Sequence, residues 1–106
     1  MSLSTHVLDA VSGRPAVGVA VTLADYSDTE LATGVTDNDG RIGVLSRRLE
    51  AGRYRLRFDT GAYFAAQQAR SFYPEVVVSF EVVDPDSHHH VPLLLSPYAY
   101  STYRGS

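Results

Sequence analysis

The sequence has no cysteine, no lysine and no long apolar run. Without cysteine, the chain can form neither a disulfide nor a thiolate site. All nine basic side chains are arginine, and the formal net charge of −3 excludes the strongly basic surface typical of nucleic-acid binding. No apolar stretch approaches the roughly 20 residues that cross a membrane. Neither nucleic acid nor a membrane is therefore expected as a partner.

Targeting signals and two common catalytic motifs are also missing. Residues 1–4 provide neither the basic nor the apolar segment of a signal peptide, and residues 104–106 are not a peroxisomal signal. The sequence as given therefore predicts a cytoplasmic protein. It contains no glycine-rich phosphate loop and no Gly-x-Ser-x-Gly nucleophile elbow.

What the sequence does contain is a series of short β-strand patterns. Its 106 residues, 44% of them hydrophobic, suit one domain spanning residues 1–106. Residues 60–70, rich in alanine and glutamine, predict one short helix. The expected strands cover residues 3–9, 17–23, 31–36, 42–45, 53–58, 75–83, 88–95 and 98–104. This arrangement predicts an all-β fold, a β-sandwich.

A turn motif precedes Arg41. Asp37-Asn38-Asp39-Gly40 predicts a tight β-hairpin between residues 31–36 and 42–45, because its last residues tolerate positive φ. Arg41 follows directly, where its planar guanidinium could hold a carboxylate, an oxyanion or carbonyl groups. An exposed arginine that merely begins a strand would give the same pattern, so both interpretations stay open.

Three of the four histidines stand together at residues 88–90. In an extended strand His88 and His90 lie on one face, about 7 Å apart along the chain, whereas His89 shares the other face with Val91. Two imidazoles so placed could bind a metal together with His6, or could exchange protons near neutral pH. A surface histidine cluster beside a turn is the third possibility.

Both faces of this strand carry apolar side chains. Val91, Leu93 and Leu95 form an ordinary core face, while Pro92 and Leu94 lie on the opposite face beside the two imidazoles. A strand that is apolar on both faces is usually covered on both. In so short a chain, we expect another subunit to cover the second face.

Four separated motifs and a fifth segment carry a family resemblance. They are Thr5-His6-Val7-Leu8-Asp9, Asp39-Gly40-Arg41, His90-Val91-Pro92-Leu93-Leu94-Leu95-Ser96-Pro97, Tyr103-Arg104-Gly105-Ser106 and Phe72-Tyr73-Pro74-Glu75. Together they resemble the transthyretin-related 5-hydroxyisourate hydrolases over residues 3–106. The last tetrapeptide is the specific part, because it is similar to the hydrolases and not to the hormone-carrying transthyretins. Two positions depart from the pattern, since His89 stands where tyrosine is common and Ala99 where glycine is common.

The resemblance implies a prealbumin-like β-sandwich of two four-stranded sheets with one short helix. It also implies a homotetramer whose active sites line a channel at the dimer–dimer interface. The substrate in the family is 5-hydroxyisourate, the unstable product of urate oxidation. Hydrolysis of its cyclic amide gives 2-oxo-4-hydroxy-4-carboxy-5-ureidoimidazoline, on the route towards allantoin. Neither a metal nor another cofactor is implied.

The resemblance also assigns roles to residues of this sequence. The expected catalytic residues are His6, Arg41, His90 and Ser106, and Tyr103 and Arg104 are expected to join them in binding the substrate. His6 and His90 would position and deprotonate a water molecule. Arg41 would hold the planar, anionic substrate and stabilise developing negative charge. Ser106 would hydrogen-bond the substrate or relay a proton, and the sequence leaves open which histidine is the base.

Two other functions are compatible with parts of the sequence. A carrier of the transthyretin type would bind a small aromatic ligand in the same channel without chemistry, but it would need no water-activating histidines. A metal-dependent site could be built from His6, His88 and His90, although no carboxylate stands as an obvious fourth ligand.

Overall fold

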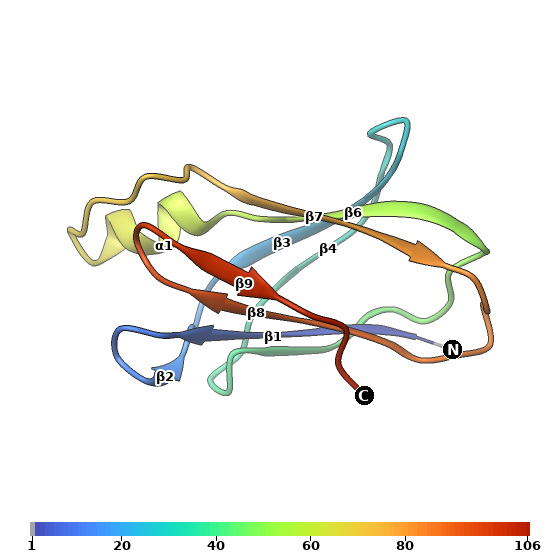
Figure 1. Ribbon diagram of the computed structural model, residues 1–106, viewed down its shortest axis with the longest axis horizontal. Coiled ribbons are helices and arrows are strands. Elements are labelled where there is room, and N and C mark those ends of the chain that lie inside the picture. The colour runs from blue at the N-terminus through green and yellow to red at the C-terminus, as the bar shows by residue number, and fades with distance from the viewer. Residues whose placement is uncertain (1) are drawn as a thin grey trace.

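Residues 2–106, which the computed structural model describes, form two β-sheets that pack face to face, with a short helix at one end (Figure 1). Met1 lies outside the described residues. One sheet contains β1 (Leu3–Asp9), β2 (Arg14–Pro15), β5 (Arg41–Ser46), β8 (His89–Leu95) and β9 (Tyr100–Thr102). The other contains β3 (Ala20–Asp25), β4 (Glu30–Val35), β6 (Gly52–Phe58) and β7 (Val76–Val82), and helix α1 (Thr60–Ala66) joins β6 to β7. The predicted all-β sandwich is confirmed.

Strand β1 organises the five-stranded sheet. It pairs in parallel with β8, from Leu3 opposite His89 to Asp9 opposite Leu95. Its other side is divided between two antiparallel strands, because β5 pairs with its first half and β2 with its last two residues. This sheet therefore has five strands instead of the expected four, although β2 and β5 share one position beside β1. The second sheet has the expected four strands, in the order β4-β3-β6-β7.

Alternation along the strands builds the core between the two sheets. On β6, Tyr54, Leu56 and Phe58 are buried while the arginines between them point outward. The core face of β8 is buried in the same way. Each fully buried apolar side chain of this size contributes about 1.5–3 kcal/mol. The core therefore gives the polar outer face of the five-stranded sheet a rigid base.

The helix is shorter than the predicted residues 60–70. Asp59 caps its start, because the Asp59 carboxylate accepts a hydrogen bond from the backbone of Ala62 at 3.4 Å. It ends at Ala66, and Gln68 adopts the left-handed conformation with φ of 57°. The alanine and glutamine content that suggested four more residues does not reveal this break. Within residues 2–106, no helix is long and apolar enough to cross a membrane.

The tight turn at residues 37–40 is present, but the predicted hairpin is wrong, because the turn joins the two sheets. β4 belongs to the four-stranded sheet and β5 to the five-stranded sheet. The Asp37 carboxylate accepts hydrogen bonds from the backbone N–H groups of Asp39 (2.9 Å) and Arg41 (3.0 Å). Gly40 has φ of 73°, and a Cβ there would collide with a carbonyl oxygen of β1. The glycine therefore lets the turn dock on β1, which places Arg41 beside that strand.

Candidate active site

Three neighbouring strands present polar side chains on the outer face of the five-stranded sheet. Ser4 lies opposite His90 in the parallel β1–β8 pair, and His6 lies opposite Arg41 in the antiparallel β1–β5 pair. Side chains alternate along a strand, so burial of Thr5 in the core directs Ser4 and His6 to the other face. The strand register thus gathers polar groups from segments that lie far apart in the sequence.

A hollow of about 340 Å³ opens beside these strands. It is lined by Ser4, Thr5, Arg41, Ile42, Gly43, His88, His90 and Ser106. Three of the predicted catalytic residues, Arg41, His90 and Ser106, therefore share one concave site. The fourth, His6, stands next to it, opposite Arg41 in the strand register.

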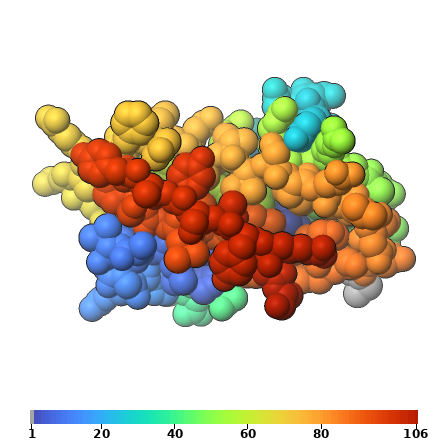
Figure 2. Space-filling model, in the orientation of Figure 1, coloured from blue at the N-terminus to red at the C-terminus, as the bar shows by residue number. Residues whose placement is uncertain are grey.

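The C-terminal segment reaches this hollow by continuing along β8. After β9 the chain, dark red in Figures 1 and 2, keeps the antiparallel register and reaches the start of β8, where Gly105 forms a bridge with His90. The backbone N–H of Gly105 donates a hydrogen bond to the carbonyl of His90 at 2.9 Å. Ser106 is thereby placed in the same hollow as Arg41, although β9 itself pairs with the second half of β8.

Serine hydroxyls fix the orientation of two imidazoles. The Ser4 hydroxyl lies 2.7 Å from Nδ1 of His90 and 2.9 Å from Nε2 of His88. The Ser2 hydroxyl lies 2.7 Å from Nδ1 of His88. The two rings stack with their centroids 6.4 Å apart. Because Ser4 engages Nδ1 of His90, the Nε2 atom of that ring is left to meet a ligand.

The surroundings of His90 favour its neutral form. Burial lowers the pKa of His90 below its ordinary value of 6.5. The positive charge of Arg41 lowers that pKa further, as do His6 and His88. The imidazole is therefore neutral at neutral pH and can accept a proton on Nε2. A neutral base beside a guanidinium suits the activation of water and the stabilisation of an oxyanion.

Tyr103 and Arg104 line a second hollow, of about 270 Å³, and do not line the one that contains Arg41. The walls of this second hollow come from β7, β8 and the end of β9, and His90 borders both hollows. Substrate binding by Tyr103 and Arg104 stays a prediction. His89 also lines the second hollow and faces away from His90, as the alternation predicted.

His89 is expected to make the fold sensitive to acid. Its side chain is only 7% exposed, and burial lowers its pKa below 6.5, with a further lowering from the charge of Arg104. The unfolded chain therefore binds a proton at this position more readily than the folded chain. The free energy of unfolding consequently falls as the pH drops below about 6.5. We expect His89→Tyr to make this fall less steep.

Urea unfolding at a series of pH values measures the effect. The control is Ser101→Ala, on the exposed surface of β9, which should keep the slope of the unmodified protein. Some slope should remain in His89→Tyr, because His90 also has a lowered pKa. Identical slopes in His89→Tyr and the unmodified protein would show that His89 does not contribute.

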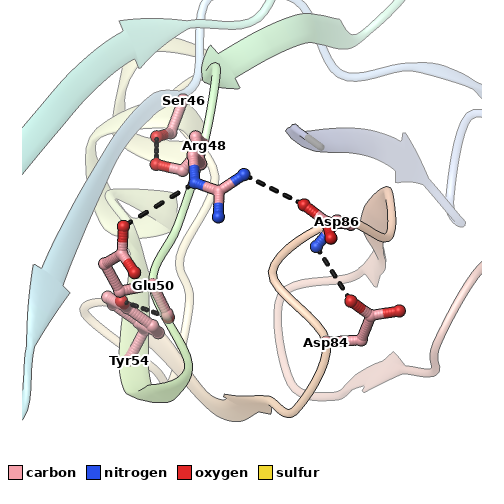
Figure 3. A network of polar contacts seen from close by, with 6 residues as sticks. All are labelled: Ser46, Arg48, Glu50, Tyr54, Asp84 and Asp86. Atoms are coloured by element: carbon pink, nitrogen blue, oxygen red, sulfur yellow. Dashed lines mark hydrogen bonds and ion pairs between the residues drawn. The ribbon is translucent and has the colours of Figure 1, made fainter.

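An ionic network connects the turn before His88 to the segment between β5 and β6 (Figure 3). Arg48 contacts Asp86 at 3.0 Å and Glu50 at 3.7 Å. The Asp84 carboxylate accepts a hydrogen bond from the backbone of Asp86 at 3.0 Å, which closes the turn. All these ion-pairing side chains are more than half exposed, so the pairs add little stability. We infer that the network mainly orients the chain as it enters β8.

The geometry does not favour the metal-binding alternative. Within residues 2–106, no group of three or more histidine, cysteine, aspartate or glutamate side chains lies close enough together to hold a metal ion. His88 and His90 are instead bridged by the Ser4 hydroxyl. His6 does not complete such a group with them.

Ser4 is a site residue that the sequence patterns did not single out. It precedes His6 by two residues and therefore shares the same face of the strand. This spacing is the one feature of the sequence that could have indicated Ser4. Its contact with His90 depends on the parallel register of β1 and β8, which no local pattern encodes.

Comparisons with known proteins agree with the fold. The sequence model of the HIUase/Transthyretin family matches residues 3–105. A 5-hydroxyisourate hydrolase of Salmonella dublin is 49% identical over 109 residues, which cover 98% of this chain and 80% of that protein. The structure of Klebsiella pneumoniae 5-hydroxyisourate hydrolase is similar with a TM-score of 0.92 and 42% identity, covering 99% of this chain and 93% of that one. Sea bream transthyretin in complex with thyroxine is similar with a TM-score of 0.91 and 37% identity, covering 99% and 95%.

These similarities span every strand of both sheets. They confirm the resemblance that the sequence motifs indicated. The chain therefore belongs to the HIUase/transthyretin family.

Proposed function

We propose that this protein hydrolyses 5-hydroxyisourate, the reaction for which its relatives in Salmonella dublin and Klebsiella pneumoniae are named. The observation that carries the proposal is the hollow in which Arg41, His90 and Ser106 meet beside His6. Its volume of about 340 Å³ suits a small planar molecule. The neutral imidazole of His90 and the guanidinium of Arg41 supply a base and an oxyanion partner.

In the proposed reaction His90 is the general base. A water molecule in the hollow gives a proton to Nε2 of His90 while its oxygen forms a bond to the ring carbonyl carbon. Arg41 donates hydrogen bonds to the oxyanion that develops. The carbon–nitrogen bond of the cyclic amide then breaks, and the leaving nitrogen takes up the proton that the water released. The base returns to its neutral form and the ring is open.

The remaining predicted residues have supporting roles in this proposal. His6 positions the attacking water from the β1 side, opposite Arg41. Ser106 hydrogen-bonds the substrate from the C-terminal segment. Tyr103 and Arg104 support binding from the second hollow, which shares His90 with the first.

The proposal includes a cytoplasmic homotetramer with its active sites at the dimer–dimer interface. On the same face as His90, Pro92 is already buried within the single chain but Leu94 is only half-buried, and a partner subunit would complete the cover of Leu94. Tyr98, Tyr100 and Tyr103 are exposed at 66, 41 and 61%, which supports a further contact surface near β9. Light scattering coupled to size-exclusion chromatography tests the assembly, and a monomer would refute it.

A direct assay tests the activity. Urate oxidase generates 5-hydroxyisourate in the cuvette, and the decay of its ultraviolet absorbance is followed with and without this protein. Decay faster than the spontaneous rate is the expected result. Decay at the spontaneous rate in the presence of well-folded protein would refute the proposal.

Gly105→Ala is expected to lower turnover about tenfold through the geometry of the site. A Cβ at residue 105 would strike the imidazole of His90, so the ring and Ser106 must move apart. Steady-state kinetics with circular dichroism as a check on folding measures the effect, and Ser101→Ala is the exposed control on β9. Full turnover in a folded Gly105→Ala variant would show that this close contact is not needed.

A non-catalytic carrier is the second candidate, favoured by the likeness to sea bream transthyretin in complex with thyroxine. A carrier would bind an aromatic ligand at the same outer face of the five-stranded sheet. The presence of Arg41, His90 and Ser106 around one hollow favours catalysis over ligand transport. Tight binding of an iodinated phenol without any hydrolysis would reverse this preference.

A further inference from the structure

A continuous line of hydrogen-bonding groups connects His90 with the surface. It runs from Nδ1 of His90 to the Ser4 hydroxyl at 2.7 Å, and from that hydroxyl to Nε2 of His88 at 2.9 Å. It continues from Nδ1 of His88 to the Ser2 hydroxyl at 2.7 Å. Ser4 is 7% exposed, whereas the His88 side chain is exposed to solvent. Every separation is a normal hydrogen-bond length.

The backbone holds this line in place. The parallel register sets Ser4 directly opposite His90, and the N–H of His89 donates to the carbonyl of Ser2 at 2.8 Å. The rings of His88 and His90 lie nearly parallel, with an interplanar angle of 16°. The two-residue step from His88, just before β8, to His90 thus leaves a gap between the rings that one serine hydroxyl spans.

A lasting positive charge on His90 would be costly. Arg41 faces it from β5 and His6 from β1, and both lower its pKa. None of the residues within 2–106 that line the hollow containing Arg41 has a carboxylate side chain, whereas Glu81 lines the second hollow, which His90 also borders. Burial of the ring adds to this cost. The proton taken from water therefore needs a better-solvated destination than His90.

We propose that Ser4 and His88 form a proton relay that moves this proton from His90 to the solvent-exposed imidazole of His88. As water protonates Nε2 of His90, the proton on Nδ1 passes to Ser4 Oγ, and the Ser4 hydroxyl proton passes to Nε2 of His88. Water thus loses one proton, His90 and Ser4 each gain one and lose one, and His88 becomes the imidazolium. The reverse transfers protonate the leaving nitrogen. The relay rests on the proposed hydrolysis and makes Ser4 a positioning residue that acts through His90.

Two variants interrupt the relay at different points. Ser4→Ala removes the bridging hydroxyl, and His88→Gln removes the final proton acceptor. Each should lower kcat about tenfold with little change in KM, because neither group is the base or the oxyanion partner. The double variant should lose no more kcat than either single variant, because each substitution alone already interrupts proton transfer. Ser4→Thr, which keeps the hydroxyl, should recover most of the kcat lost in Ser4→Ala.

The dependence of kcat on the deuterium content of the solvent separates proton relay from simple support. In the unmodified protein, the transfer of several protons in one step gives a curved dependence. In Ser4→Ala, the transfer of a single proton should give a straight line. Ser27→Ala, in the exposed turn between β3 and β4, is the matched control and should keep the curve. Circular dichroism checks the fold of each variant.

The outcomes distinguish the relay from the function on which it rests. Absence of hydrolysis in the unmodified protein would overturn the proposed function. Hydrolysis by the unmodified protein together with an unchanged curve in Ser4→Ala would overturn the relay alone. If the loss of kcat in the Ser4→Ala, His88→Gln double variant equalled the product of the two single losses, the relay would also be overturned, because the two groups would then act separately.

Discussion

His90→Gln is expected to lower kcat about 10²–10⁴-fold, the range that a general base contributes. Glutamine is uncharged and cannot take up and release a proton near neutral pH. It is similar in size to histidine, and its side chain can keep a hydrogen bond to the Ser4 hydroxyl, so the fold and the assembly should survive. The measurement is the rate of 5-hydroxyisourate decay above the spontaneous rate, with thermal unfolding as the check on stability.

His6→Gln is the comparison that assigns the base. If His90 removes the proton and His6 positions the water, His6→Gln should lose less turnover than His90→Gln. The order follows from the neutral state of His90, whose pKa is lowered by burial and by Arg41. A larger loss in His6→Gln would assign the base to His6, and near-normal turnover in His90→Gln would remove His90 from the mechanism.

Arg41→Ala should lower kcat/KM about 10²–10³-fold, the usual effect of losing a group that stabilises an oxyanion. Both kcat and KM should change, because the guanidinium is proposed to bind the anionic substrate as well as the transition state. A shift in pH dependence should accompany the loss. Arg41 lowers the pKa of His90, so its removal raises that pKa and moves the acidic fall of kcat/KM to higher pH.

Two further variants separate charge from shape at this position. Arg41→Lys keeps a positive charge but loses the planar fork, so the acidic fall should stay near its original pH while part of the activity is lost. Arg57→Ala, on the outward face of β6 in the other sheet, should change neither quantity. An unshifted acidic fall in Arg41→Ala would show that Arg41 does not act on the base.

Local sequence patterns predict most strands, because the alternation of apolar and polar side chains is visible in neighbouring residues. Residues 53–58 are the clearest case, with the apolar members buried as predicted. The turn at residues 37–40 shows the limit of such patterns. Its acidic and glycine residues do form a tight turn, but β5 pairs with β1 and not with β4. Strand pairing depends on packing between distant segments, which the turn residues do not record.

The candidate site was predictable to a similar extent. Strand alternation was enough to put His88 and His90 on one face and His89 on the other, and the residue after Gly40 was a reasonable place for a functional arginine. The meeting of Arg41 with His90 was accessible only through family resemblance. The contact between Ser4 and His90 joins residues 86 positions apart, and no local rule predicts it.

The parallel pairing of β1 with β8 has a consequence for how the protein folds. This pairing closes a loop nearly as long as the chain, so it carries a large loop-closure entropy cost. Such a long-range contact is expected to form late in folding. During synthesis β1 can meet β2 and β5 early, but its other edge stays unpaired until β8 has left the ribosome. That open edge is the part of the nascent chain most exposed to aggregation. Because Ser4 and His90 come together only when it closes, recovery of activity would mark the last step of refolding.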